Sequence, residues 1–278
     1  VARAYAHFML AYLWCKPYNE ATAASDLGLA YITTPEKHVF GHYTRIPLKE
    51  YYDAIERDPN PGIPLLDDSK YKQPRFHFTT AAAHAFATRF YLMKAQWNKV
   101  IEHADAVLGA NAETKLRNIK TLNAVALESR SAYYTESSNP SNILVGTARS
   151  ALAYRFQTHK YSLTLQKMAE ICSPRNTHPL NFSNISWEAV NSALGDGAGN
   201  IVFPKSNYYY KYVNRSAGTR VYYSAAVLFS YDEVYLNRLE AYLMSGNLDQ
   251  FRRDLFTYLI PKTHNSSRPN EAYPFPRM

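Results

Sequence analysis

Two stretches of the chain decide its fold: AAAHAFATRFYLMKAQWNKVI at residues 81–101 and DEVYLNRLEAYLMSGNLDQF at residues 232–251. When Tyr91-Leu92-Met93 is aligned with Tyr242-Leu243-Met244, Trp97-Asn98 falls on Leu248-Asp249. Each copy predicts a helix with small and aromatic residues on one face, a three-residue break and a second amphipathic helix. Such a helical hairpin is the repeating unit of tetratricopeptide-like proteins, which stack hairpins into binding scaffolds.

The two hairpins predict a mostly α-helical protein with long irregular loops and little strand. We expect a single domain over residues 1–278, with hairpins near 81–108 and 232–258 that superpose on each other. Tyr91 and Tyr242 occupy matched positions and are expected to be buried, since each is the large residue with which the first helix packs on the second.

Outside the hairpins, the pattern predicts further helices at 2–14, after Pro47 and at 161–171, and a short strand at 143–145. Two segments are polar and aromatic and are expected to be irregular: a loop at 131–142 and a loop-rich insertion at 173–230. A long irregular stretch inside a compact domain is usually functional.

Composition and charge exclude several classes of protein. The net charge is +8, but Lys and Arg are scattered, so no basic stripe for nucleic acid is expected. No stretch approaches the ~18 apolar residues of a membrane span. Cys15 and Cys172 fit no metal-binding spacing. The chain starts inside a helical pattern without an initiator Met, so we expect it to be part of a longer protein.

Residue patterns typical of enzymes are weak, and neither a metal nor a cofactor is predicted. The sequence has no GxSxG, phosphate-loop or GxGxxG motif. His38 and His42 are four residues apart, but they lie in a stretch that resembles a loop. The acidic pairs Asp67-Asp68 and Asp232-Glu233 fall in a turn and in the first turn of a helix, where such acids have structural roles.

A binding site needs fewer specific residues than a catalytic site does. It needs flat aromatic faces for sugar rings or peptides, with amide side chains beside them, on loops held by a rigid scaffold. The 24 tyrosines supply many such faces, although most are expected to seal helix packing. Because a strand alternates sides, at least one of Tyr208, Tyr209 and Tyr210 should face outward. The predicted ligand-binding residues are Tyr133, Tyr134, Asn139, Trp187 (with Asn191 beside it), Asn207, Tyr208, Tyr209 and Tyr210.

Four blocks of the chain, in order and at similar spacing, resemble the SusD/RagB family of proteins. The opening block contains Arg3-Ala4-Tyr5-Ala6-His7-Phe8, Lys16-Pro17-Tyr18-Asn19, Thr22-Ala23, Asp26-Leu27-Gly28 and Thr33-Thr34-Pro35-Glu36; the others are Arg45 with residues 49–58, residues 81–105, and residues 232–242. The chain departs from the family pattern at Leu239, at Pro59-Asn60-Pro61, and by lacking an N-terminal lipoprotein region and the C-terminal third.

This resemblance implies a tetratricopeptide-like surface lipoprotein of Bacteroidetes that is not an enzyme. Such proteins lie over a SusC-like TonB-dependent transporter on the extracellular face of the outer membrane, held by a lipid anchor that would lie outside this chain. They capture oligosaccharides and deliver them to the transporter. Two alternatives stay open: a RagB-like protein that captures peptides, and a helical-repeat scaffold that docks other proteins and binds no small ligand.

Overall fold

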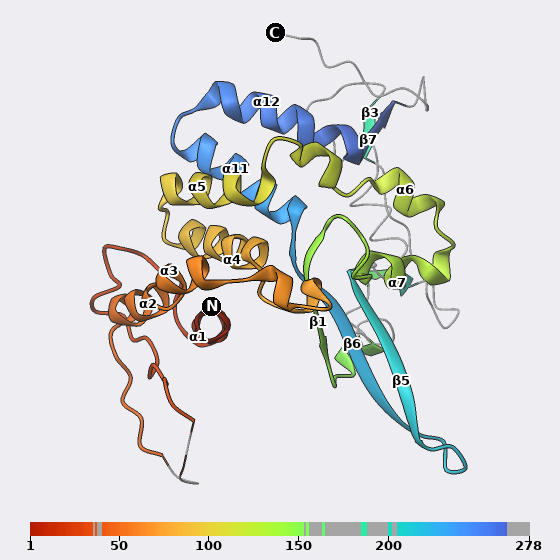
Figure 1. Ribbon diagram of the computed structural model, residues 1–278, viewed down its shortest axis with the longest axis horizontal. Coiled ribbons are helices and arrows are strands. Elements are labelled where there is room, and N and C mark those ends of the chain that lie inside the picture. Colours follow the sequence, from red (N-terminus) through yellow and green to blue (C-terminus); the bar gives the residue numbers. More distant parts are fainter. Residues whose placement is uncertain are drawn as a thin grey trace. The chain divides into compact units, whose positions relative to one another are not determined.

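The structure is a computed structural model that describes residues 1–35, 37, 41–152, 154–155, 163–164, 185–187, 200–201 and 205–265 (Figure 1). Contacts along the chain divide it into two compact units. The first unit comprises Val1–Gly109 and Val234–Asn247, and the second comprises Ala110–Glu233 and Leu248–Met278. Among the described residues, no helix combines the length and the hydropathy that crossing a bilayer requires.

The first unit is helical, as predicted, with a core of aromatic rings. Its helices are α1 (Ala2–Trp14), α2 (Leu48–Arg57), α3 (Pro59–Gly62), α4 (Thr80–Met93), α5 (Trp97–Leu108) and most of α11 (Tyr231–Met244), with short 3-10 turns η1 (Ile63–Leu65), η2 (Asp68–Lys70) and η3 (Pro74–Phe76). Phe8 of α1 makes edge contacts with Phe86 and Phe90 of α4, and Tyr52 of α2 stacks on Phe90. Large rings therefore join α1, α2 and α4.

Polar contacts tie the residues of the first two family-like blocks together. Arg3 of α1 forms a two-pronged ion pair with Asp58, with both N···O distances 2.6 Å. His7 lies 2.7 Å from the Tyr51 hydroxyl through Nδ1 and 2.9 Å from the Ile32 carbonyl through Nε2. Because a carbonyl only accepts, Nε2 carries a proton and donates to Ile32. The Tyr51 hydroxyl also lies 3.2 Å from the His7 backbone carbonyl, to which it can donate. These residues hold α1, the following loop and α2 in one arrangement.

The first hairpin, α4–α5, forms as predicted, and Thr79 caps it by accepting a hydrogen bond from the Ala82 amide at 3.2 Å. Helix α4 ends where the Gln96 amide donates to the Tyr91 carbonyl at 3.0 Å, with Ala95 at φ 53°. This is a Schellman motif, whose left-handed residue is usually glycine.

Helix α11 ends in the same way at the aligned position. The Asn247 amide donates to the Tyr242 carbonyl at 2.9 Å, with Gly246 at φ 79°. The sequence alignment of the two copies is therefore confirmed at the level of the turn, and Tyr91 and Tyr242 are buried as predicted, with 3% and 8% exposed. Helix α12 (Leu248–Leu259) also forms. The superposition of the two hairpins stays a prediction, as does a single domain over the whole chain.

The second unit combines short helices with a small antiparallel sheet. Its helices are α6 (Ile119–Ala124), α7 (Arg130–Thr135) and α12, with 3-10 turns η4 (Ala112–Lys115), η5 (Leu127–Ser129) and η6 (Ile260–Lys262). The sheet has the order β1-β6-β5, formed by β1 (Asn142–Ala148), β6 (Thr219–Ser230) and β5 (Ser206–Asn214). Two short pairs join β2 (Leu163–Thr164) to β4 (Asn200–Ile201) and β3 (Ile185–Trp187) to β7 (Thr263–Asn265).

Three local predictions are wrong, although the mostly helical class is confirmed. Residues 206–230 form the β5–β6 hairpin and not an irregular insertion, because their tyrosines, valines and threonine favour a pleated strand and Gly218 supplies the positive φ of the turn. Residues 131–135, predicted as part of the 131–142 loop, belong to helix α7. Residues 163–164 lie in β2 and not in the helix predicted for 161–171. There, apolar spacing alone does not separate a short strand from a helix.

Candidate functional site

One face of the β5–β6 hairpin is covered by tyrosine rings. Tyr210 lies directly opposite Tyr222, and Tyr212 lies opposite Arg220. Opposite residues of an antiparallel pair share a face, and so do residues two apart along one strand. Tyr208, Tyr210, Tyr212, Tyr222 and Arg220 therefore form one surface, here called the tyrosine face.

The rings of the tyrosine face lie at distances typical of aromatic contact. Tyr210 is 5.4 Å from Tyr212 and 6.0 Å from Tyr222 between ring centroids. At the inner end, Tyr154 stacks on Tyr222 at 4.7 Å and meets Tyr208 at 5.4 Å. At the outer end, the guanidinium of Arg220 lies 4.5 Å from the centroid of Tyr210 and 4.9 Å from that of Tyr212. The face is thus a continuous aromatic surface with one cation on it.

Among the described residues, the opposite face of the hairpin carries one stacked pair, Tyr209 on Tyr223, at 5.2 Å and with the rings nearly parallel at 7°. Tyr209 is 47% exposed and Tyr210 on the tyrosine face is 43% exposed. The prediction that at least one of Tyr208, Tyr209 and Tyr210 faces outward is confirmed. Tyr209 and Tyr210 are therefore adjacent in sequence, similarly exposed and on opposite faces of the hairpin.

The outer half of the hairpin has only two strands. Strand β1 pairs with β6 from Ser230 back to Ser224, where β1 ends at Ala148. From Thr219 to Tyr223, β6 pairs with β5 alone among the described strands, and the turn lies at the far end of the hairpin from α7 and β1 (Figure 1). A two-stranded ribbon is marginal by itself, so cross-strand tyrosine pairs also stabilise it. The same tyrosine rings thus stabilise the hairpin and remain accessible to a ligand.

Helix α7 packs against strand β5. Most of the predicted site residues lie on these two neighbouring elements: Tyr133 and Tyr134 on α7, and Asn207, Tyr208, Tyr209 and Tyr210 on β5. Tyr134 is half-buried beneath the Arg117 guanidinium, 3.6 Å from its ring centroid, and burial raises the pKa of its hydroxyl.

The structure gives Asn139 a local role. Its side chain is 5% exposed, donates to the Tyr133 carbonyl at 3.2 Å and accepts from the Ser141 amide at 3.0 Å. It therefore shapes the turn before β1. Trp187 lies in β3, opposite Thr263, with its side chain outside the described residues, and Asn191 also lies outside them. Ligand contact by any of the predicted residues stays a prediction.

The acidic pairs have structural partners, as predicted. Asp67 accepts from the Ser69 amide, and Asp68 accepts from the Thr80 amide at 2.8 Å. Asp232, at the start of α11, accepts from the Arg117 amide and pairs with Lys262. Across the described residues, no group of three or more His, Cys, Asp or Glu is arranged to hold a metal ion. His38 lies outside those residues.

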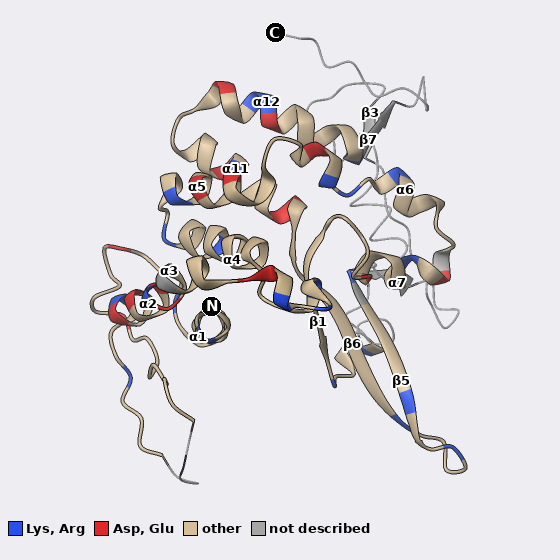
Figure 2. Cartoon of the chain, viewed as in Figure 1, with Lys and Arg blue, Asp and Glu red and all other residues tan. Residues whose placement is uncertain are grey.

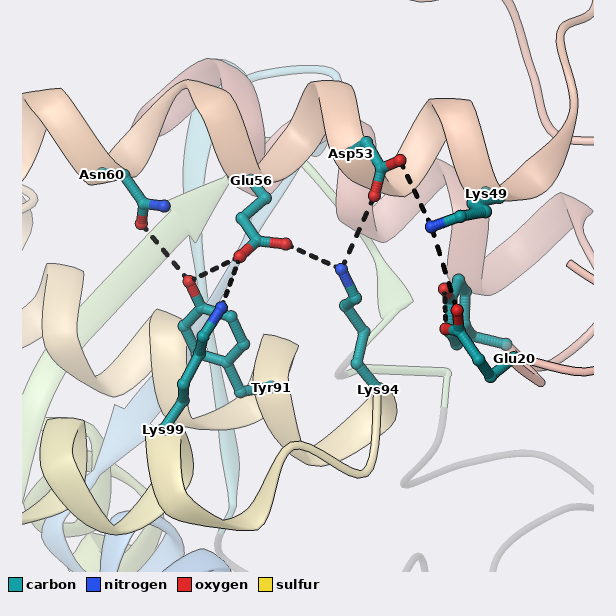
Figure 3. Close-up of polar contacts among 9 residues, drawn as sticks. Glu20, Lys49, Asp53, Glu56, Asn60, Tyr91, Lys94 and Lys99 are labelled. Atoms are coloured by element: carbon teal, nitrogen blue, oxygen red, sulfur yellow. Dashed lines mark hydrogen bonds and ion pairs between the residues drawn. The ribbon is translucent and has the colours of Figure 1, made fainter. Parts of the chain in front are cut away.

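In the first unit the main polar cluster is centred on Glu56 of α2 and is internal (Figure 3). Lys94 and Lys99 donate to its two carboxylate oxygens at 2.7 and 2.8 Å, and the Tyr91 hydroxyl lies 3.1 Å from one of them. The Lys94 side chain is only 4% exposed. Burial alone would raise the pKa of Glu56, but the two lysine hydrogen bonds outweigh it and lower that pKa to about 2. Glu56 is therefore ionised at neutral pH, and both of its carboxylate oxygens have hydrogen-bond partners within the protein.

A cavity of about 330 Å³ adjoins this cluster, lined in part by His84, His103 and Tyr91. The two histidines face each other with Nδ1 atoms 2.8 Å apart, and Tyr91 stacks on His103 with the rings parallel within 1°. Burial lowers the pKa of both imidazoles. One nitrogen must donate and the other accept, so the two polar atoms at this wall satisfy each other.

The sequence reasoning missed Tyr154, Tyr212, Tyr222 and Arg220 as members of the site. For three of them a signal existed: Tyr208, Tyr210 and Tyr212 recur at every second residue, and residues 219–223 read Thr-Arg-Val-Tyr-Tyr, which suits a strand. Reading the two runs as a hairpin around Gly218 would have placed Tyr222 and Arg220 on the same face as Tyr210. Tyr154, 68 positions away from Tyr222, left no such signal.

Comparisons with known proteins agree with this architecture. Residues 1–92 match the SusD-like family model described as starch-binding and associating with the outer membrane. A SusD superfamily protein from Bacteroides thetaiotaomicron matches 97% of this chain and 59% of its own, with TM-score 0.60 and 16% identity. A SusD-like carbohydrate binding protein from Bacteroides vulgatus matches 92% of this chain and 53% of its own, with TM-score 0.55 and 15% identity. No curated protein matches.

The chain thus spans between half and three fifths of the length of these two solved structures. Identities of 15–16% establish a shared fold, and the family match adds the N-terminal third of the chain. The family description speaks of starch binding, and the description of the Bacteroides vulgatus structure speaks of carbohydrate binding. The resemblance drawn from the sequence is supported in two ways: residues 1–92 match the SusD-like family model, and the chain shares its fold with solved SusD superfamily structures.

Proposed function

We propose that this chain is the part of a cell-surface protein that captures oligosaccharides, and that the tyrosine face is where the sugar is held. The proposal is supported by the SusD-like fold and by the family description, which names starch binding and association with the outer membrane. The observation that carries it is the continuous aromatic surface of Tyr208, Tyr210, Tyr212 and Tyr222 on the β5–β6 hairpin.

Exposed tyrosine rings suit a sugar chain for a simple physical reason, although the rings here are inclined to one another, with Tyr210 and Tyr212 meeting edge to face at 88°. The C–H face of a pyranose ring is apolar and packs on a phenol ring, while its rim of hydroxyls exchanges hydrogen bonds with tyrosine hydroxyls and water. Rings 5–6 Å apart offer successive contacts to successive sugar units. Each aromatic contact contributes about 1 kcal/mol, so several rings give useful affinity without any covalent step.

The partner and the location follow from the same proposal. The captured oligosaccharide would pass to a SusC-like TonB-dependent transporter on the extracellular face of the outer membrane, with a lipid anchor in a part of the protein outside this chain. The family description supports association with that membrane. The scaffold for this role is the helical first unit, whose polar and aromatic side chains are largely engaged with one another.

The test compares two tyrosines that are adjacent in sequence and point to opposite faces. Binding of a panel of soluble oligosaccharides would be measured by titration calorimetry for the native chain, for Tyr210→Ala and for Tyr209→Ala. Both side chains are similarly exposed, at 43% and 47%. Loss of one stacking contact of about 1 kcal/mol predicts a roughly fivefold weaker affinity for Tyr210→Ala and no change for Tyr209→Ala.

Equal loss in both variants, together with a lowered melting temperature, would assign the rings to hairpin stability and reject this face as the site. Binding of a peptide mixture with no oligosaccharide bound would favour the peptide-capture alternative. That outcome has a structural route, because β5 is the edge strand of its sheet and an extended peptide can pair with such an edge. A partner protein that binds with no small ligand would favour the docking scaffold.

A further inference from the structure

The charged side chains of the β5–β6 hairpin are all positive. Residues 205–230 contain four positively charged side chains and not one Asp or Glu: Lys205, Lys211, Arg215 and Arg220. Figure 2 shows only positive residues along β5, β6 and the turn that joins them. Such a segment attracts anions over a distance comparable to the Debye length, about 8 Å in physiological salt.

Elsewhere in the described structure, three buried or partly buried cations have carboxylate partners, whereas the buried Arg117 side chain donates to the Asn142 amide oxygen and the Tyr134 carbonyl. Lys94 pairs with Glu56, and Arg238 pairs with Asp105 in the first unit; Lys262 pairs with Asp232 in the second. On the hairpin, no carboxylate among the described residues lies within ion-pair distance of Lys211, Arg215 or Arg220. The charge of these side chains is therefore left for solvent or for a ligand.

Arg220 differs from the other hairpin cations because it is part of the tyrosine face. Its guanidinium lies over Tyr210 and Tyr212 at 4.5 and 4.9 Å from their centroids. Contact with aromatic rings and a side-chain hydrogen bond with Tyr222 orient the planar group. A guanidinium has five N–H donors, so this bond does not use them all. Those donors match the two oxygens of a carboxylate or sulfate, which accept in a forked geometry. A neutral sugar would have to share the ring surface with Arg220 and gain little from its charge.

We propose that the tyrosine face is built for acidic oligosaccharides, with a carboxylate or sulfate of the glycan on the Arg220 guanidinium and neighbouring sugar rings on Tyr210 and Tyr212. This inference rests on the proposed function and specifies its cargo. The anion neutralises the one cation within the aromatic surface, while Lys211 increases the rate of encounter through its field.

The experiment uses the native chain and three ligands of matched length: an oligogalacturonide, a sulfated chondroitin oligosaccharide and a neutral maltooligosaccharide. We expect at least one acidic ligand to bind about tenfold more tightly than the neutral one, because one charge-assisted hydrogen-bond pair is worth about that factor. The carboxylate and sulfate arms show which anion is preferred. Raising salt from 50 to 200 mM should weaken acidic binding severalfold and leave neutral binding unchanged.

Variants then locate the effect. Arg220→Ala should lose about tenfold in affinity for the acidic ligand and little for the neutral one, and Arg220→Lys should recover only part of it because Lys lacks the forked donors. Arg215→Ala, which removes an equal charge from the turn, is the matched control and should change affinity less than about twofold. If Arg220→Ala does not fold, Arg220→Lys and the salt series on the native chain carry the same test.

Equal affinity for neutral and acidic ligands, insensitive to salt and to Arg220→Ala, would overturn the inference about charge and leave oligosaccharide capture standing. Absence of binding to all three glycans would overturn the proposed function itself. Binding of a poly-glutamate peptide in place of the acidic glycans would overturn the glycan assignment and make an acidic peptide the cargo of the same face.

Discussion

The Glu56 cluster of the first unit and the tyrosine face of the second use similar residues in opposite ways. Around Glu56, two lysines and a tyrosine hydroxyl are held against one carboxylate, and the Lys94 side chain is almost fully buried. On the hairpin, tyrosines and Arg220 lie on a surface with no carboxylate beside them among the described residues. The charged side chains around Glu56 therefore stabilise the fold, whereas the charge of Arg220 on the hairpin remains available to a ligand.

This difference bears on how the chain is recognised. The family match covers residues 1–92, which include Arg3, Asp58 and Glu56, whose contacts hold helices together. The hairpin at 206–230 lies outside that match. The sequence features that identify the fold are thus separate from those that would bind cargo, as expected when one scaffold carries variable sites.

The largest expected effect contrasts one residue type in the two regions. Tyr91→Ala should lower the free energy of unfolding by about 3 kcal/mol or more, because it removes a buried ring from the α4–α5 hairpin. Tyr209→Ala, at an exposed position on the hairpin, should cost less than about 1 kcal/mol. Urea unfolding followed by circular dichroism measures both. Similar losses of unfolding free energy in the two variants would contradict the distinction between a buried tyrosine that stabilises the core and an exposed tyrosine on the hairpin.

Glu56→Gln should cost about 3 kcal/mol at pH 7, because it leaves the Lys94 ammonium buried without its main carboxylate partner. Glu50→Gln is the matched control, since Glu50 lies exposed on the same helix and should change stability by less than about 0.5 kcal/mol. Oligosaccharide affinity should be unaltered in both variants at a temperature where they are folded. A change in affinity with Glu56→Gln would mean that the cluster takes part in binding.

Acid should weaken the first unit through the same cluster. The pKa of Glu56 is lowered from 4.5 to about 2, so its carboxylate stabilises the folded state above pH 4.5. That stabilisation is lost as pH falls from 4.5 toward 2, and should amount to about 2 kcal/mol or somewhat more. Unfolding curves at pH 7, 4.5 and 3 measure it. The native chain and Glu56→Gln should converge in stability at low pH; parallel curves would contradict this origin.

The smallest effect concerns the two aligned turns. Ala95 adopts φ 53° where the other copy has Gly246 at φ 79°. A left-handed alanine is strained, so Ala95→Gly should raise stability by about 0.5 kcal/mol, and Gly246→Ala should lower it by about 1 kcal/mol. Thermal unfolding of the two single variants measures the difference. Loss of stability in Ala95→Gly would show that the two turns do not share their energetics.

Sequence reasoning succeeded where a pattern repeats over a long stretch. The alignment of Tyr91 with Tyr242 predicted burial of both rings, and the shared C-terminal turn follows from the same register. Helix periodicity over 14 residues of α4 and of α11 leaves little ambiguity. The four family-like blocks, read together, gave the SusD-like fold, which the comparisons confirm.

The candidate site was less accessible to sequence reasoning. Tyr208, Tyr209 and Tyr210 were selected as loop residues, but the direction of each ring depends on strand pairing, which separates Tyr209 from its two neighbours. Asn139 was selected for its amide, which local geometry engages in a turn. Arg220 was not selected at all, because its role depends on the cross-strand register with Tyr212. Pairing between distant segments cannot be read from local propensity.

The early end of β1 at Ala148 has a consequence for how the hairpin moves. Beyond Ser224, β6 pairs with β5 alone among the described strands, with one further backbone hydrogen bond from the Ser150 amide to the Tyr222 carbonyl at 3.1 Å. Backbone amides of the outer rungs should therefore exchange with deuterated solvent through local opening, well before those of α4 and α5. A sugar lying across several rungs would fasten the strands together and slow that exchange. Slower exchange of these backbone amides would then indicate that a sugar is bound to the hairpin.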